Sequence, residues 1–160
     1  MVSKEVEKLL LKVQKPGRYV GGELNEVIKD KKKVDCRFAF CFPDTYEVGM
    51  SHLGMKILYS LMNAVPYIWC ERVFAPWVDM EEEMIKHNIP LYALESGDPV
   101  SDFDFIGFTL QYELSFTNML NMLRLSGVPI KSCDRKELKN IVIADRKSTR
   151  LNSSHITISY

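Results

Sequence analysis

Two sets of polar side chains in this sequence could hold a ligand. Carboxylate, hydroxyl, amide and imidazole groups supply hydrogen bonds and metal ligands, and glycines let a backbone approach a ligand closely. The first set is Asp44, Thr45, Tyr46, Gly49, Ser51, His52 and Gly54, and the second is Thr109, Gln111, Tyr112 and Glu113. Ordinary turn chemistry, with Asp44 capping a turn, is the alternative explanation of the first set.

Each set follows an apolar segment that reads as a buried strand. The run 38–42 predicts a strand over 34–42, and helical spacing after it predicts a helix over 49–64, with Ser51 available as its N-cap. The second set ends a strand over 103–110. Ligands of open parallel sheets bind outside the carboxyl ends of the strands. With a strand order of 2-1-3-4-5 or a similar one, the two sets meet there, and Ala75–Trp77 and Glu95–Ser96 frame the same shallow surface.

The whole chain alternates strand and helix patterns. This alternation predicts an α/β fold with a doubly wound, Rossmann-like and mostly parallel sheet that carries helices on both faces. Gly127, followed by Pro129, marks the end of the third helix of this unit. We expect strands at 34–42, 68–74, 91–94, 103–110 and 140–144, and helices at 4–13, 49–64, 80–87 and 115–125.

The last sixteen residues differ in character from the rest. Residues 145–160, DRKSTRLNSSHITISY, lack apolar periodicity and can be back-translated, in one frame, into a common sequencing-library adapter. We therefore interpret them as a non-native tail that packs against nothing. Removing three basic residues and one acidic residue from totals of 21 and 21 leaves 18 basic and 20 acidic residues. This balance gives no electrostatic case for nucleic acid or an anionic membrane as a partner.

Composition excludes several other classes of protein. No apolar run approaches the roughly 20 residues that span a bilayer, and the charged amphipathic N-terminus is no signal peptide, so we expect a cytoplasmic protein. The four cysteines are scattered, which indicates reduced thiols and no metal site. Neither a dinucleotide-binding glycine motif nor a P-loop is present.

Four strings carry a resemblance to a known family. The strings PDTYEVGMSHLGMKILY, ERVFAPWVDMEEEM, FDFIGFTLQYELSFTNMLNMLRLSGVP and NIVIA follow one another as in the N-terminal region of a group of bacterial radical S-adenosylmethionine (radical SAM) proteins. The chain resembles that region from Val13 to Ala144. In the family, a cobalamin-binding-like domain precedes a radical core. The resemblance implies an N-terminal helix and connector at 1–33, a truncated cobalamin-binding-like Rossmann domain at 34–144, and the tail at 145–160.

The resemblance also implies what the chain lacks. Radical SAM cores hold a [4Fe–4S] cluster on a Cys-x-x-x-Cys-x-x-Cys loop, and no such spacing occurs here. We therefore expect no catalytic residue in this chain. The parent protein, with its cluster and S-adenosylmethionine, would be a radical SAM enzyme, and the partner of this domain would be the missing core.

Cobalamin is the cofactor that the resemblance implies for the two polar sets. Many cobalamin domains carry Asp-x-His-x-x-Gly, whereas here Met50 stands two residues before His52 and only Leu53 separates His52 from Gly54. We therefore do not expect His52 to bind cobalt, although cobalamin can bind without a protein ligand. The alternative is a scaffold domain that packs on the radical core without cobalamin. A free-standing flavin mononucleotide module is less favoured, since the loop lacks a Ser/Thr/Gly-rich run.

Overall fold

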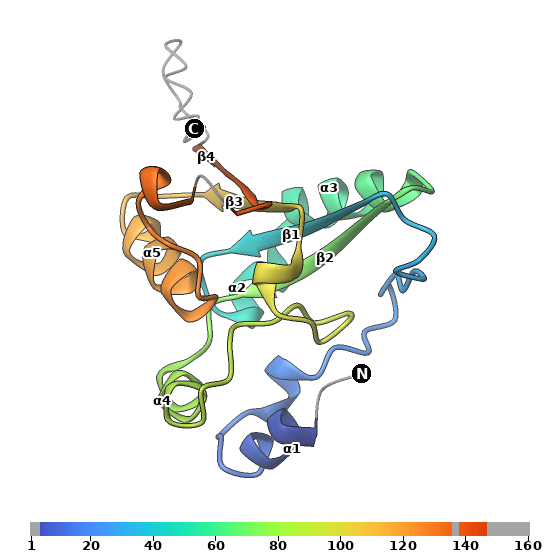
Figure 1. The fold of residues 1–160 in the computed structure, drawn as a ribbon. Coiled ribbons are helices and arrows are strands. Elements are labelled where there is room, and N and C mark those ends of the chain that lie inside the picture. Colours follow the sequence, from blue (N-terminus) through green and yellow to red (C-terminus); the bar gives the residue numbers. More distant parts are fainter. Residues whose placement is uncertain (1–3, 136–137, 147–160) are drawn as a thin grey trace.

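A computed structural model describes residues 4–135 and 138–146 of the chain (Figure 1). These residues form a sheet of four parallel strands in the order β2-β1-β3-β4, which confirms the predicted α/β fold. The strands are β1 (Cys36–Phe42), β2 (Ile68–Phe74), β3 (Phe105–Leu110) and β4 (Ile141–Arg146). The α-helices are α1 (Lys4–Leu10), α2 (Tyr46–Ser51), α3 (Leu53–Ala64), α4 (Val78–Lys86) and α5 (Ser115–Leu125), and 3-10 helices cover Pro16–Tyr19, Val100–Asp102 and Ser132–Arg135.

Alternate side chains of β1 enter two different cores. Phe40 and Phe42 pack with Tyr59 of α3, so we call this side of the sheet the α3 face. Ala39 and Cys41 point to the opposite side, the α5 face. Helices therefore cover both faces of the sheet, as Figure 1 shows for α3 and α5. The buried residues of the α5 face include four methionines of α4 and α5, which are Met80, Met84, Met119 and Met122.

The prediction of a strand at 91–94 is wrong. These residues are buried, as their apolar character indicated, but the segment folds back on itself and meets the sheet through the Leu94 amide, which donates to the Arg72 carbonyl, without forming a strand. The Val100 amide donates to the Leu91 carbonyl at 2.9 Å, and Tyr92 forms an isolated antiparallel bridge with Pro99. Pro99 and the positive φ of Gly97 make this turn. Without a strand here, β3 lies directly beside β1.

The helix predicted at 49–64 is two helices, α2 and α3. Ser51 ends α2, and its hydroxyl donates to the Val48 carbonyl, so its predicted role as N-cap is wrong. By contrast, the bounds predicted for α5 are confirmed. Gly127 follows α5 with a φ of 70°, and the Val128 amide closes the turn on the Leu123 carbonyl at 3.0 Å.

The last described strand extends beyond its predicted end. The backbone of Asp145 and Arg146 continues β4 and pairs with Thr109 and Leu110 of β3. The prediction that the tail packs against nothing is therefore wrong for Asp145 and Arg146. Residues 147–160 lie outside the described part of the chain. Among the described residues, no helix has the length and apolar character that crossing a bilayer requires.

Candidate functional site

The loops that follow β1 and β3 lie side by side at the carboxyl edge of the sheet, as predicted. The Tyr112 hydroxyl donates to Asp44 Oδ2 at 2.8 Å, and the Asn118 amide donates to the Pro43 carbonyl at 3.0 Å. The chain after β2 joins them, because the Ala75 amide donates to the Asp44 carbonyl at 3.0 Å. The chain passes from β1 to β2 on one side of β1, and then crosses to β3 on the other side of β1. The gap between the loops after β1 and β3 is therefore the topological switch point of the sheet.

The polar groups of the two predicted sets are largely paired with protein groups. Besides the bond from Tyr112, Asp44 accepts the Thr45 amide at 2.7 Å. The Gln111 amide donates to the Thr109 hydroxyl at 2.7 Å. The side chain of Thr45 does not cap α2. Glu113 is exposed and also takes part in an interaction. Of these bonds, the one between Tyr112 and Asp44 joins the two loops, and the other two lie within one loop each.

Tyr46 is turned away from the carboxyl edge and into the protein. Its hydroxyl donates to Glu23 at 2.8 Å, and its ring packs edge-on against Phe74 at 5.4 Å between centroids. Burial, together with the hydrogen bond to Glu23, raises the pKa of Tyr46 to about 12. Tyr46 therefore stays protonated near neutral pH and acts as a hydrogen-bond donor.

His52 caps α3. Its Nδ1 accepts the Met55 amide at 3.1 Å, and its ring lies 5.3 Å from the ring of Phe42. Because Nδ1 is the acceptor, a neutral imidazole carries its proton on Nε2 and offers no lone pair there. Cobalt ligation by His52 would require a change of tautomer and the loss of the cap. The residues present therefore do not fit a histidine-ligated cobalamin.

The two glycines of the first set serve the protein core and a helix turn. Gly49 is buried, and a Cβ placed on it would lie 2.1 Å from the ring of Phe74. Gly54 stands in the first turn of α3, where a Cβ would meet only the His52 ring, at 3.0 Å. Contacts within the protein therefore account for Gly49, and Gly54 has ordinary helix surroundings.

We predict that Gly49→Ala lowers the free energy of unfolding by about 1–3 kcal/mol, because the added methyl group overpacks the core. The matched control is Gly54→Ala, for which any displacement of the His52 ring is offset by the preference of helices for alanine, worth about 1 kcal/mol. Urea unfolding followed by circular dichroism measures both. A Gly49→Ala variant as stable as the unmodified chain would contradict this account of Gly49.

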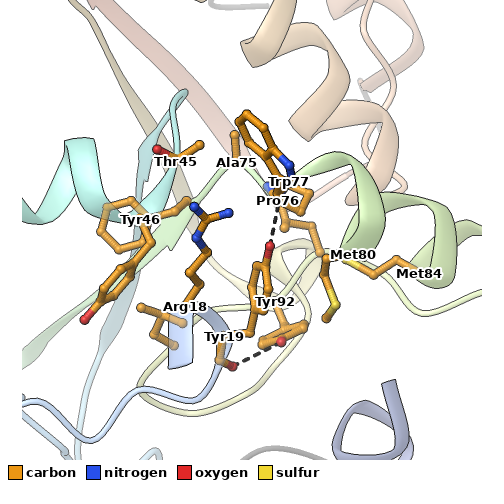
Figure 2. Close-up of a pocket in the computed structure, with 13 residues that line it drawn as sticks. Arg18, Tyr19, Thr45, Tyr46, Ala75, Pro76, Trp77, Met80, Met84 and Tyr92 are labelled. Carbon is orange, nitrogen blue, oxygen red and sulfur yellow. Dashed lines mark hydrogen bonds between the residues drawn. The ribbon is translucent and has the colours of Figure 1, made fainter. Parts of the chain in front are cut away.

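The chain after β2 closes a small cavity (Figure 2). The Arg18 guanidinium lies over the Trp77 ring at 5.5 Å, and the Trp77 amide donates to the Tyr19 hydroxyl at 3.1 Å. The cavity has a volume of about 20 Å³, which suits one or two water molecules and no cofactor. Trp77 thus fixes the N-terminal segment against α4 while part of its ring remains exposed.

Glu95 and Ser96 do not frame the carboxyl edge, and this prediction is wrong. Glu95 is buried against the middle of β2, where it receives the Arg72 amide at 2.7 Å and the Arg72 Nε at 2.6 Å. The Ser96 amide donates to Glu71 at 3.0 Å. The cause is the turn after 91–94, which carries both residues along the open side of β2.

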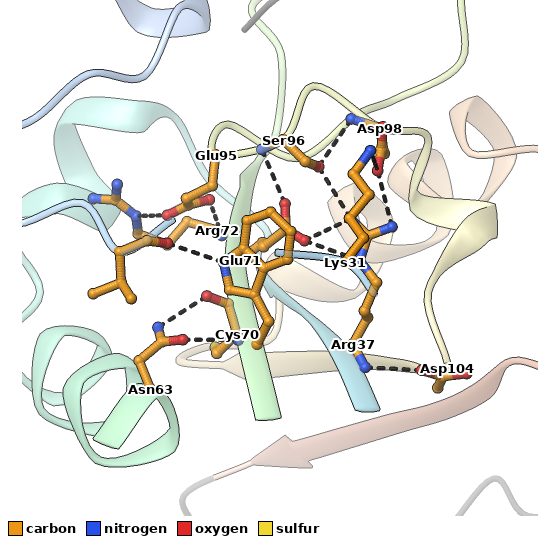
Figure 3. Close-up of polar contacts among 12 residues, drawn as sticks. Lys31, Arg37, Asn63, Cys70, Glu71, Arg72, Glu95, Ser96, Asp98 and Asp104 are labelled. Carbon is orange, nitrogen blue, oxygen red and sulfur yellow. Dashed lines mark hydrogen bonds and ion pairs between the residues drawn. The ribbon is translucent and has the colours of Figure 1, made fainter. Parts of the chain in front are cut away.

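Two buried ionic clusters, which the sequence reasoning missed, lie on opposite faces of β2 (Figure 3). On the α3 face, Arg72 pairs with Glu95 at 2.6 Å and with Glu23 at 2.8 Å. On the α5 face, Arg37 pairs with Glu71 at 2.6 Å and with Asp98 at 2.9 Å. The sequence carries one signal for them, since charged residues interrupt the apolar pattern of β2. It does not show their partners.

A groove between the connector 23–27 and α3 is a second feature that sequence reasoning missed. Its volume is about 780 Å³, which falls within the range of small-molecule sites. Arg72 lies at its base, but the guanidinium is already paired with two carboxylates and lies over the Tyr59 ring at 4.8 Å. Arg72 therefore offers no unpaired positive charge to a ligand in the groove.

The cysteines form no metal centre in the described part of the chain. All four are free, and no group of three or more His, Cys, Asp or Glu side chains among the described residues could hold a metal ion. Burial raises the pKa of the Cys41 and Cys70 thiols well above its usual range, which keeps them protonated. These two thiols pack as small apolar groups.

Comparison with known proteins gives one match. The family described as "Radical SAM proteins, N-terminal" matches residues 54–157, which is more than half of the chain. No curated protein and no solved structure gives a significant match. The matched residues include α3, β2, α4, β3, α5 and β4, and thus most of the described sheet.

Proposed function

Because the chain belongs to the family of radical SAM proteins, N-terminal, we propose that it is an N-terminal scaffold domain that docks on the iron–sulfur core of a radical SAM enzyme. The core would lie outside these 160 residues, since the chain has no Cys-x-x-x-Cys-x-x-Cys spacing. The cluster and S-adenosylmethionine would supply the radical chemistry there. This domain would contribute a binding surface.

The observation that carries this proposal is the exposed apolar character of the carboxyl edge. Large side chains from the segments after three neighbouring strands remain exposed there, although polar residues would solvate loops at lower cost. The loops that carry them are held together by the hydrogen bonds around Asp44, so the edge is a preformed surface. The exposed large side chains of the carboxyl edge are Val48, Trp77, Val78, Tyr112 and Leu114.

Hydrogen exchange tests the docking proposal. We expect the amides of residues 75–78 and 111–114 to exchange at least about tenfold more slowly in the full-length parent than in this chain, because docking excludes water from them. Replacing both Trp77 and Leu114 by aspartate in the parent should remove the protection. Ile85→Asp, at a position 49% exposed on α4, is the matched control and should leave it unchanged. Equal exchange in parent and chain would refute the proposal.

A cobalamin that takes no cobalt ligand from the protein is the second candidate. The observation that favours it is the meeting of the loops after β1 and β3 at the switch point, where open α/β sheets bind their ligands. When bound, the group would supply cobalt-centred chemistry to the parent. The groups nearest to it would be the rim residues Asp44, Thr109, Gln111 and Tyr112.

We predict that His52→Ala leaves any cobalamin binding by the full-length parent unchanged and costs the domain about 0.5–2 kcal/mol, the usual effect of losing an N-cap. Absorption titration with hydroxocobalamin measures the binding, and urea unfolding measures the stability. Gln111→Ala is the comparison variant at the proposed rim. Loss of a histidine-dependent absorption band in His52→Ala would show that cobalt ligation does occur.

We further propose that residues 145–160 are derived from an adapter and that the native sequence departs from this chain within β4. The support is the back-translation of the printed sequence, which begins at Asp145. The family match continues to residue 157, and the described strand includes Asp145 and Arg146. Sequencing the source gene across β4 decides the question, and a native reading frame identical to residues 145–160 would refute the proposal.

A further inference from the structure

The two edges of the sheet differ in how their backbone groups are paired. In a parallel sheet, alternate residues of an edge strand point their N–H and C=O groups away from the neighbouring strand. On β2 these residues include Ile68, Cys70 and Arg72, and on β4 they include Val142 and Ala144.

The open side of β2 is closed by other parts of the chain (Figure 3). Asn63 of α3 acts in place of a neighbouring strand, because its side chain accepts the Cys70 amide at 3.0 Å and donates to the Cys70 carbonyl at 2.9 Å. The Arg72 amide donates to Glu95, and the Arg72 carbonyl accepts the Leu94 amide at 3.0 Å.

The first outward residue of β2 is closed in the same way. The Ile68 amide donates to the Val65 carbonyl at 3.2 Å, and the Ile68 carbonyl accepts Lys29 Nζ at 2.5 Å. All backbone groups that Ile68, Cys70 and Arg72 turn outward are therefore paired. No further strand can add to β2 along these residues without breaking those bonds.

In the part of the chain that the structure describes, the outer side of β4 has no such partners. The Ile141 amide donates to the Asp104 carbonyl at 2.9 Å, so Ile141 and Ile143 turn their backbone groups toward β3, and Val142 and Ala144 turn theirs outward. Within residues 4–135 and 138–146, no group pairs with the outward groups of Val142 and Ala144. An unpaired edge of this kind is a template for another strand.

The two faces of β4 differ in how far their side chains are covered. Val142 is buried on the α5 face, whereas Ile141 is 48% and Ile143 is 42% exposed on the α3 face. α3 packs on β2 and β1, and the helix that packs most closely on β3 is α5, which lies on the opposite face. Among residues 4–135 and 138–146, none pairs with this edge, and Ile141 and Ile143 remain about half exposed beside it.

We propose that β4 receives a fifth parallel strand, followed by an α-helix that covers Ile141 and Ile143, from the radical SAM parent of this domain. A parallel neighbour needs a crossover of about a dozen residues or more before its own strand of about five or six. Only fourteen residues, 147–160, follow β4 in this chain. They are too few for both parts, so the parent must supply the strand from outside the chain. This inference rests on the proposed function.

Hydrogen exchange of single amides tests the open edge. In this chain the Val142 and Ala144 amides should exchange about tenfold or more faster than the Cys70 and Arg72 amides, which are the matched groups of the closed edge. In the full-length parent they should become as slow as those of Cys70 and Arg72. Protection in this chain that disappears on deleting residues 147–160, or on tenfold dilution, would overturn the proposal and assign the edge to the tail or to a second copy.

A substitution tests the covering helix. Ile143→Lys should lower the melting temperature of the parent by several degrees more than that of this chain, because the exposed part of the side chain is covered in the parent only. Ile85→Lys, which is similarly exposed on α4, should change neither. Equal effects of Ile143→Lys in parent and chain would overturn the proposal. Protection of β4 without protection of residues 75–78 and 111–114 would instead refute the docking function and leave the fifth strand standing.

Discussion

Replacement of Arg72 by methionine should lower the free energy of unfolding by about 3–5 kcal/mol, because it leaves the buried Glu95 carboxylate without its partner. Arg72 is 5% exposed and Glu95 is 2% exposed, so water cannot replace the lost contacts. Chemical unfolding of the 160-residue chain measures the loss. The double variant Arg72→Met/Glu95→Gln should regain part of it, since residue 95 then carries no charge.

The matched control is a surface ion pair of similar geometry. Arg124 pairs with Glu81 at 2.8 Å, but its side chain is 55% exposed. Arg124→Met should therefore cost less than about 1 kcal/mol. An Arg72→Met variant no less stable than Arg124→Met would show that Glu95 does not depend on Arg72.

The loss in Arg72→Met should also depend on pH. Burial raises the pKa of Glu95 to about 7, against the opposing effect of Arg72. Between the ordinary value of 4.5 and about 7, the folded state holds more protons than the unfolded state, so stability from this group falls as pH rises. Without Arg72 the pKa rises further, and the fall continues to higher pH. The deficit of the variant should thus be larger at pH 8 than at pH 5, and a deficit independent of pH would contradict this account.

The second large effect is expected for Trp69→Ala, which should cost about 3–5 kcal/mol. Trp69 is 2% exposed, its Nε1 donates to the Val27 carbonyl at 2.9 Å, and Arg37 lies over its ring at 5.2 Å. The substitution removes a large buried ring and releases the connector from β2. Thermal and urea unfolding measure the change.

Two further variants separate the contributions. Trp69→Phe keeps most of the buried area and loses the hydrogen bond, so it should cost about 1–3 kcal/mol. Trp77→Ala removes the other tryptophan of the chain, which is 47% exposed, and should cost clearly less than Trp69→Ala. Equal losses for the two alanine variants would contradict the assignment of Trp69 to the core.

Local patterns in the sequence were sufficient to locate the four strands of the described sheet and α5. Runs such as 38–42 must be buried on both faces, and residues at helical spacing must share one face, whatever the rest of the fold does. The same reasoning placed the loops after β1 and β3 together, because parallel strands bring their carboxyl ends to one edge. It was wrong for 91–94, since an apolar run of four residues reports burial and not strand pairing.

The pairing of the polar groups was decided by the tertiary structure alone. Glu23 and Arg72 are 49 residues apart, and Arg37 and Asp98 are 61 apart, so no spacing in the sequence could indicate that they meet. His52 and Gly49 read as ligand groups because their chemistry permits it. In the fold, His52 accepts the Met55 amide of α3, and the Phe74 ring fills the space beside Gly49. Hydrophobic periodicity is a local property and fixes the elements, whereas a polar group binds whatever the folded chain brings within about 3 Å of it.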